Sequence, residues 1–137
     1  RKIMAETPEI FEQSFLVEER HLDEQNHVNN VQYVQWVQDV AKAHWESRAT
    51  KEQNEKFFWI VVTHEISYKQ QAFLGDRILL QTYVGETSHV KSVRHVIIKN
   101  AETEKVLVEA KTTWALMDQE KKRPTKISEE LKKVFQQ

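Results

Sequence analysis

Alternation of apolar and polar positions marks the start of the chain and most of its second half. From Phe11 to Val17 the larger side chains fall on one parity, which predicts a strand over residues 9–18. Similar alternating or β-branched runs predict further strands over residues 58–68, 77–84, 90–99 and 106–116. Polar turns separate the later runs, so we expect these strands to pair as antiparallel neighbours.

The period changes between the first and second predicted strands. Gln32, Gln35 and Gln38 recur every third residue, and the apolar side chains between residues 28 and 48 follow the same helical spacing. The apolar stripe consists of Tyr33, Trp36, Val37, Val40, Ala41 and His44, and it is widened by Val31, Val34 and Trp45. Because a strand would alternate by two, the stripe predicts a helix in spite of its valines. Its width predicts burial on most sides.

Only strands and turns are expected between this helix and the tail of the chain. Pro124 breaks the last strand, and Ser128 is placed to cap a short C-terminal helix. The resulting order is a strand, a long helix, four strands and a short helix. One antiparallel five-stranded sheet curled around the helix is the economical way to bury it, so we predict a single α+β domain over residues 1–137.

Composition excludes several classes of function. The chain has no cysteine, which removes disulfides, thiolate nucleophiles and zinc–thiolate sites. Its net charge is −1 with dispersed basic residues, so no nucleic-acid partner is expected. No apolar run approaches the ~20 residues of a membrane span, so no membrane association is expected. No signal peptide is visible in the sequence as given, and a cytoplasmic location is the default expectation.

The stretch with the most chemical content lies just before the long helix. Asp23 stands four residues before His27, and Asn29 and Asn30 open the helix-periodic run. A carboxylate and an imidazole are thus placed beside a helix start, whose free N–H groups and partial positive charge suit a developing oxyanion. The other histidines, among them His44, His64 and His95, have no metal-ligand spacing, so no metal site is expected.

This stretch resembles the opening motif of the hotdog-fold thioesterases. The matching residues run from Asp23 through His27-Val-Asn-Asn to Tyr33 and Trp36, and the order of elements agrees over nearly the whole chain. The family includes 4-hydroxybenzoyl-CoA thioesterase-like enzymes and plant acyl-ACP thioesterases. The resemblance implies an antiparallel sheet wrapped around a central helix. It also implies a homodimer or homotetramer with active sites at the subunit interface.

The resemblance also implies catalytic roles for individual residues. Asp23 matches the acid that serves as nucleophile or general base, Asn30 the position whose backbone N–H polarises the thioester carbonyl, and His27 the histidine of the plant enzymes. Gln25 stands where the plant enzymes have an orienting asparagine, and Gln71 falls where a further acid is expected. Asn26 occupies a position that is often glycine in bacterial relatives, although asparagine tolerates positive φ better than most residues.

Five further residues are candidates for contacts with the substrate. They are Asn29, Tyr33, Trp36, Tyr68 and Arg94. Four of them have an alternative interpretation: a helix cap for Asn29, core packing for Tyr33 and Trp36, and a solvated strand edge for Arg94. In its functional interpretation Arg94, with Lys91 and Ser92, holds the phosphates of CoA at the protein surface.

These observations favour hydrolysis of an acyl-CoA or acyl-carrier-protein thioester. Because the thiolate leaves without strong acid assistance, a carboxylate and an oxyanion site suffice, and no cofactor is expected beyond the CoA or phosphopantetheine portion of the substrate. Asp23 either attacks the carbonyl or deprotonates a water, and the sequence does not choose between these routes. Two alternatives remain open: a non-catalytic acyl-CoA binding module, and a hotdog dehydratase or hydratase.

Overall fold

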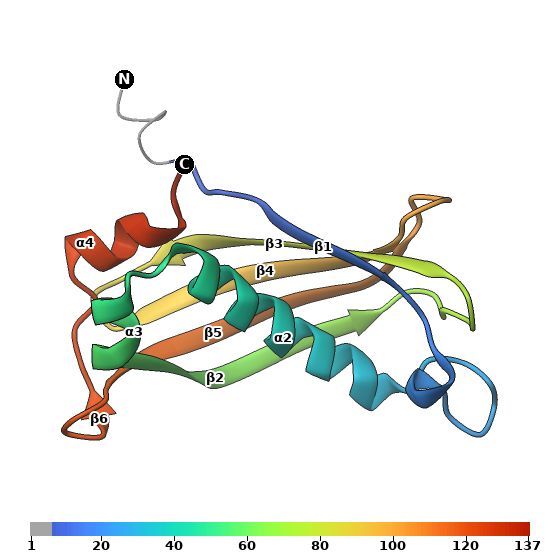
Figure 1. Ribbon diagram of the computed structural model, residues 1–137, viewed down its shortest axis with the longest axis horizontal. Coiled ribbons are helices and arrows are strands. Elements are labelled where there is room, and N and C mark those ends of the chain that lie inside the picture. The colour runs from blue at the N-terminus through green and yellow to red at the C-terminus, as the bar shows by residue number, and fades with distance from the viewer. Residues whose placement is uncertain (1–6) are drawn as a thin grey trace.

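A computed structural model gives the structure of the protein and describes residues 7–137 (Figure 1). Its elements in chain order are β1 (Phe11–Leu16), the 3₁₀ helix η1 (Glu19–His21), α2 (Asn30–Arg48), α3 (Lys51–Lys56), β2 (Phe57–Tyr68), β3 (Arg77–Thr87), β4 (Lys91–Asn100), β5 (Val106–Asp118), β6 (Arg123–Pro124), α4 (Glu129–Lys132) and the 3₁₀ helix η2 (Lys133–Phe135). In the described part of the chain, no helix is both long and apolar enough to cross a membrane.

One antiparallel sheet forms the body of the molecule. Its strand order is β1-β3-β4-β5-β2, and the two-residue strand β6 extends it by pairing with β5. The sheet curves around α2, which lies across its concave face, while α4 closes one end (Figure 1). The predicted α+β architecture of a curled sheet around one long helix, with a short C-terminal helix, is therefore confirmed.

The prediction of only strands and turns after α2 is wrong at one place. The six-residue helix α3 intervenes before β2 and is stabilised by a reciprocal capping box. Thr50 Oγ1 accepts the Gln53 N–H at 3.0 Å, and Gln53 Oε1 accepts the Thr50 N–H at 2.9 Å. A threonine followed three residues later by glutamine is the sequence signal of such a cap. Because the segment is polar and has no apolar stripe, hydrophobic periodicity does not predict this helix.

The core lies between α2 and the sheet. In the middle of α2, Val37 and Val40 are fully buried against side chains of β3, β4 and β5. At the C-terminal half, Trp45 packs with residues of β5 and of the tail. This second cluster contains Val84, Leu116, Ile127, Leu131, Val134 and Phe135. The C-terminal segment therefore completes the core beneath the end of α2.

One side of α2 is open to solvent, so the helix is less enclosed than predicted. Val31, expected in the apolar stripe, is 73% exposed, and Gln35, Asp39 and Lys42 continue the same exposed face. Next to this face, β2 is an edge strand, because it pairs with β5 and with no other strand in the described residues. A single chain thus leaves an uncovered helix face beside an unpaired strand edge.

Candidate active site

The loop before α2 is closed around the carboxylate of Asp23. Asp23 Oδ1 accepts the N–H of Gln25 at 2.8 Å and the N–H of His27 at 3.2 Å. The Asp23 N–H in turn donates to the carbonyl of His27 at 2.8 Å. Asn26 lies at the tip with φ of 64°, the left-handed conformation that asparagine tolerates. The backbone therefore fixes the carboxylate while its second oxygen stays available.

His27 lies beside that second oxygen. Its Nδ1 is 3.6 Å from Asp23 Oδ2, and both side chains are accessible, with 27% and 31% of their surfaces exposed. The imidazole also packs edge-on against Phe73, with the ring centroids 6.0 Å apart. As predicted, the carboxylate of Asp23 and the imidazole of His27 therefore lie side by side, and both are accessible from solvent.

The start of α2 is capped so that one N–H group remains free. Asn29 is the N-cap, and its side chain accepts the N–H of Val31 at 2.9 Å. The Asn29 N–H donates to the carbonyl of His21 at 3.0 Å, which ties the helix start to the chain before Asp23. The N–H of Asn30, the first helical residue, has no acceptor within residues 7–137. A free N–H at a helix start is the group required to bind an oxyanion.

A second segment lies against this loop. The Val28 N–H donates to the carbonyl of Ala72 at 3.0 Å, and His27 and Phe73 form a β-bridge. This contact brings the turn after β2, with Gln71 and its neighbours, beside the start of α2. Gln71 is exposed and carries no charge, so the acid expected there is absent from the site.

Gln25 holds Asp23 through its backbone and not through its side chain. Its side chain is exposed and hydrogen-bonds to no described residue. The predicted orienting role of the carboxamide is therefore not seen, and the backbone N–H takes the place of that contact. The longer glutamine side chain explains the difference, because a carboxamide one methylene further from the loop is free to turn into solvent.

Tyr33 and Trp36 lie in the core of the single chain. They are 2% and 5% exposed, and their rings lie edge-on with centroids 5.5 Å apart. Tyr33 Oη accepts the N–H of Ala72 at 3.1 Å, and burial raises the pKa of this phenol. Their helical spacing, which favoured core packing, agrees with these contacts, and their substrate role stays a prediction. Tyr68, by contrast, is 46% exposed, and its ring lies 6.0 Å from that of Tyr33, so its substrate role stays a prediction.

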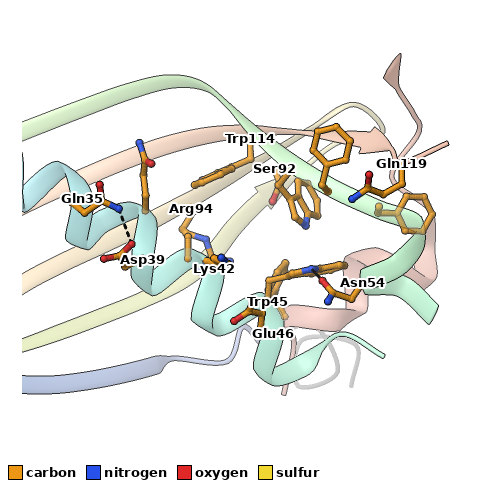
Figure 2. A pocket seen from close by; sticks show the side chains of 16 residues that line it. Gln35, Asp39, Lys42, Trp45, Glu46, Asn54, Ser92, Arg94, Trp114 and Gln119 are labelled. Atoms are coloured by element: carbon orange, nitrogen blue, oxygen red, sulfur yellow. Dashed lines mark hydrogen bonds between the residues drawn. The ribbon is translucent and has the colours of Figure 1, made fainter. Parts of the chain in front are cut away.

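A pocket of about 430 Å³ opens along the C-terminal half of α2 (Figure 2). Its floor is aromatic and is made of Trp45, Phe57, Phe58, Trp59, Trp114 and Phe135. Trp45 Nε1 donates to Asn54 Oδ1 at 3.0 Å, which holds α3 against α2 at one end of the pocket. Polar residues of the exposed helix face, including Gln35, Asp39 and Lys42, form part of the rim. Sequence reasoning missed this pocket because its lining comes from six elements.

Arg94 lies inside the protein, which contradicts its predicted place at the surface. The side chain is 4% exposed and lines the pocket. Its Nη1 donates to His44 Nδ1 and to Thr82 Oγ1, each at 3.0 Å. Arg94 faces α2 because the buried positions of β4 alternate from Ser92 through Val96 to Ile98. It cannot hold CoA phosphates at the surface, and Ser92 of the proposed surface group is buried with it.

His44 connects Arg94 to an ion pair at the N-terminal end of β1. Since a guanidinium only donates, His44 Nδ1 is the acceptor, and Nε2 carries the proton and donates to Glu9 Oε1 at 2.7 Å. Glu9 Oε2 also pairs with Arg48 Nη1 at 3.2 Å. Burial, and then the charge of Arg94, lower the pKa of His44 from 6.5 to about 4. The imidazole is therefore neutral in the folded protein at neutral pH.

This lowered pKa makes stability depend on pH. Between pH 6.5 and about 4 the unfolded chain binds a proton at His44 and the folded chain does not, so the free energy of unfolding falls as the pH falls. At about 1.4 kcal/mol per pKa unit, the loss is roughly 3 kcal/mol. Urea unfolding of the native protein and of His44→Gln at several pH values across this window measures the contribution of His44. Carboxylates present in both proteins titrate alike, so their effect drops out of the comparison. Equal pH slopes for the two proteins would contradict the assignment.

His64 and His95 lie on separate strands, β2 and β4. No group of three or more potential ligands that could hold a metal ion occurs among residues 7–137. His64 Nε2 is 3.4 Å from Gln38 Nε2, and His95 stacks on Tyr83 with centroids 4.9 Å apart.

Comparison with known families assigns the chain. The model of the acyl-ACP thioesterase N-terminal domain matches residues 8–135. The chain therefore belongs to the acyl-ACP thioesterase family, which confirms the resemblance noted in the loop before α2.

Individual relatives agree with this assignment. A chloroplastic acyl-[acyl-carrier-protein] hydrolase FATB3 from Cuphea viscosissima is 28% identical over 74 residues, which are 54% of this chain and 18% of that protein. A 1,4-dihydroxy-2-naphthoyl-CoA thioesterase from Synechocystis superposes with a TM-score of 0.80 and 18% identity, covering 93% of this chain and 96% of that one. The 12:0-ACP thioesterase from Umbellularia californica has a TM-score of 0.76 and 14% identity, over 89% of this chain and 48% of that one. The two structures confirm the predicted hotdog fold. This chain spans about half of the Umbellularia enzyme and less of the Cuphea protein.

Proposed function

We propose that this protein hydrolyses an acyl thioester, with the carboxylate of Asp23 as the reacting group and the N–H of Asn30 as the oxyanion donor. The observation that carries the proposal is the loop before α2. Two backbone N–H groups hold one oxygen of Asp23, while the other stays beside His27 at the start of a helix with a free N–H. Membership of the acyl-ACP thioesterase family supports the same reaction.

Two routes are chemically balanced at this site. In the first, Asp23 attacks the thioester carbonyl, the thiolate leaves and takes up a proton, and water then cleaves the mixed anhydride. In the second, Asp23 removes a proton from a water that attacks the carbonyl directly, and the tetrahedral intermediate then collapses to the acid as the thiolate leaves and takes up that proton. In both routes the carbonyl oxygen gains negative charge, which the N–H of Asn30 and the positive end of the α2 dipole stabilise. His27 orients Asp23 or donates a proton to the leaving thiolate.

We also propose that two copies of the chain form the functional unit. The unpaired edge of β2 is twelve residues long, and Ile60 and Val62 on it are 41% and 42% exposed. An edge of this kind readily pairs with another strand. Antiparallel pairing of two such edges in full register would set Phe57 of one copy opposite Tyr68 of the second. The pocket of each chain would then lie close to the Asp23 loop of the other.

Placing a charge on this edge should separate the copies. We expect Val62→Lys to weaken dimerisation by at least about tenfold, equivalent to about 1.4 kcal/mol, because a lysine there becomes buried without a partner on pairing. Sedimentation velocity over a range of concentrations measures the effect. Val90→Lys, at a turn residue that is 60% exposed, is the matched control and should sediment as the native protein does. A Val62→Lys protein that stays as associated as the native protein would rule out this edge as the interface.

Thiol release from a panel of thioesters tests the proposed activity. The native protein is expected to release thiol from acyl-CoA, from acyl-carrier-protein thioesters, or from both, and the relative kcat/KM values identify the preferred carrier. Binding of acyl-CoA without thiol release would instead favour a binding module. Addition of water to an enoyl thioester, with the thioester bond kept, would favour a hydratase. A cytoplasmic location stays a prediction that cell fractionation would test.

A further inference from the structure

Arg94 is a buried cation for which the described residues offer no carboxylate. It comes from the middle of β4 and is 4% exposed. Its two hydrogen bonds both leave from Nη1 and reach neutral groups, His44 Nδ1 and Thr82 Oγ1. No carboxylate within residues 7–137 lies close enough to form an ion pair with it, and its other N–H groups have no protein acceptor. Burial lowers the pKa of this guanidinium to about 9, as expected when a charge loses water without gaining a counter-ion.

The acidic side chains around Arg94 either pair with other groups or are exposed to solvent. Glu9 reaches the network only through His44 and is paired with Arg48. Asp39 and Glu46 line the same pocket, but both are exposed, and Asp39 accepts a hydrogen bond from Gln35 Nε2 at 2.8 Å. Glu9, Arg48 and Arg94 together therefore leave one positive charge uncompensated. A buried charge without a partner is costly, so an anionic ligand that pairs with it gains correspondingly.

The charge faces the pocket. Arg94 is one of the pocket-lining residues, and its guanidinium carbon lies 4.9 Å from the centre of the Phe135 ring. Figure 2 shows the side chain extending from the sheet toward α2, in the wall that it shares with Trp114 and Lys42. The rest of the lining combines six aromatic side chains with polar ones, among them Gln38, Asn54 and Gln119. The pocket therefore offers apolar surface for the body of a ligand and one fixed cation for an anionic end.

From this arrangement we propose that the protein's preferred acyl groups carry a carboxylate at the end remote from the thioester, and that Arg94 binds this carboxylate in the aromatic pocket. The inference rests on the proposed thioesterase activity and on the proposed pairing of two copies, which brings the pocket of one chain close to the Asp23 loop of the other. It adds the substrate class to that activity. An alkyl chain fills the aromatic part of the pocket equally well with or without the terminal acid. Arg94 then favours the acyl group with the terminal carboxylate, because a guanidinium with free N–H groups binds a carboxylate through paired hydrogen bonds.

Selectivity between matched substrates tests the proposal. Thiol release is measured on CoA thioesters of equal chain length, one series ending in a methyl group and the other in a carboxylate. The native protein should prefer the carboxylate series by at least about tenfold in kcat/KM, and Arg94→Met should abolish this preference. Arg94→Lys keeps the charge and should retain part of the preference. Arg77→Met, at an exposed arginine, is the matched control and should behave as the native protein does.

The ratio of the two kcat/KM values is insensitive to the folded fraction of a variant, because both substrates meet the same preparation. Equal or lower activity on the carboxylate series, or an unchanged preference in Arg94→Met, would overturn the proposal. Calorimetric binding of the corresponding non-hydrolysable amides separates this inference from the activity itself. If the native protein hydrolyses neither series but binds the carboxylate-ended amide more tightly through Arg94, the pocket assignment holds and the thioesterase proposal fails. Equal binding of the two amides would refute the pocket assignment.

Discussion

Replacing Asp23 by asparagine should reduce kcat/KM for the preferred thioester by about a thousandfold, within the range of 10²–10⁴ typical of a lost catalytic base. The reason is chemical and not structural. Asparagine keeps an oxygen that can accept the N–H groups of Gln25 and His27, but it neither attacks a carbonyl nor deprotonates water at neutral pH. Steady-state thiol release, with the melting temperature measured in parallel, gives both numbers. The variant should melt within a few degrees of the native protein.

A second turn in the same chain provides the control. Asp118 Oδ1 accepts the N–H groups of Glu120 and Lys121 at 2.9 Å and 2.8 Å, the same type of contact that Asp23 makes. Asp118 lies at the end of β5, and we assign it no catalytic role. Asp118→Asn should therefore keep native activity. Similar losses in the two variants would show that Asp23 acts by organising its turn, and full activity in Asp23→Asn would remove it from the mechanism.

Trp36→Ala should lower the free energy of unfolding by about 3–5 kcal/mol, the usual cost of deleting a large buried aromatic side chain. Trp36 is 5% exposed and contacts Phe15, His21 and Tyr33, with ring centroids 5.0, 5.2 and 5.5 Å away. Urea unfolding followed by circular dichroism measures the change.

The same variant distinguishes packing from substrate contact. Because Trp36 does not line the pocket, Trp36→Phe should keep the native ranking of acyl substrates even though it loses some stability. A changed chain-length preference in a folded Trp36→Phe protein would restore the substrate role that the sequence suggested. Val31, on the exposed face of the same helix, offers a control, since Val31→Ala should cost little stability.

The periodicity of apolar residues along the sequence predicted the fold well. The stripe from Tyr33 to His44 required a helix, and the parity of positions from Val106 to Leu116 required a strand, because burial against one core imposes those periods. The helix α3 escaped notice because it buries no residue and depends on a local capping box at Thr50. Burial of α2 on most sides was also expected, and a single chain does not provide it. In the proposed unit of two copies, the second copy would cover this face.

The site was predictable only where its parts are close in sequence. Asp23, His27, Asn29 and Asn30 share one loop and helix start, so their spacing alone brought them together. Arg94 was misplaced because its surroundings come from distant segments: His44 is 50 positions away, and Glu9 is 35 positions from His44. From the sequence alone, a charged residue in an alternating strand is expected to be exposed, because the packing of the helix over the sheet is not known. Only the fold shows that its side chain points inward.

Product analysis in a single turnover tests the central claim most directly. Native protein in excess over its preferred acyl-CoA or acyl-carrier-protein substrate is quenched at intervals, and the free thiol and the carboxylic acid are quantified. If Asp23 and the start of α2 hydrolyse the thioester, each thiol is matched by one acid, Asp118→Asn follows the native time course, and Asp23→Asn leaves the thioester intact over that time. A thioester that stays intact with the native protein across the panel, or that is consumed equally fast by Asp23→Asn, would contradict the account.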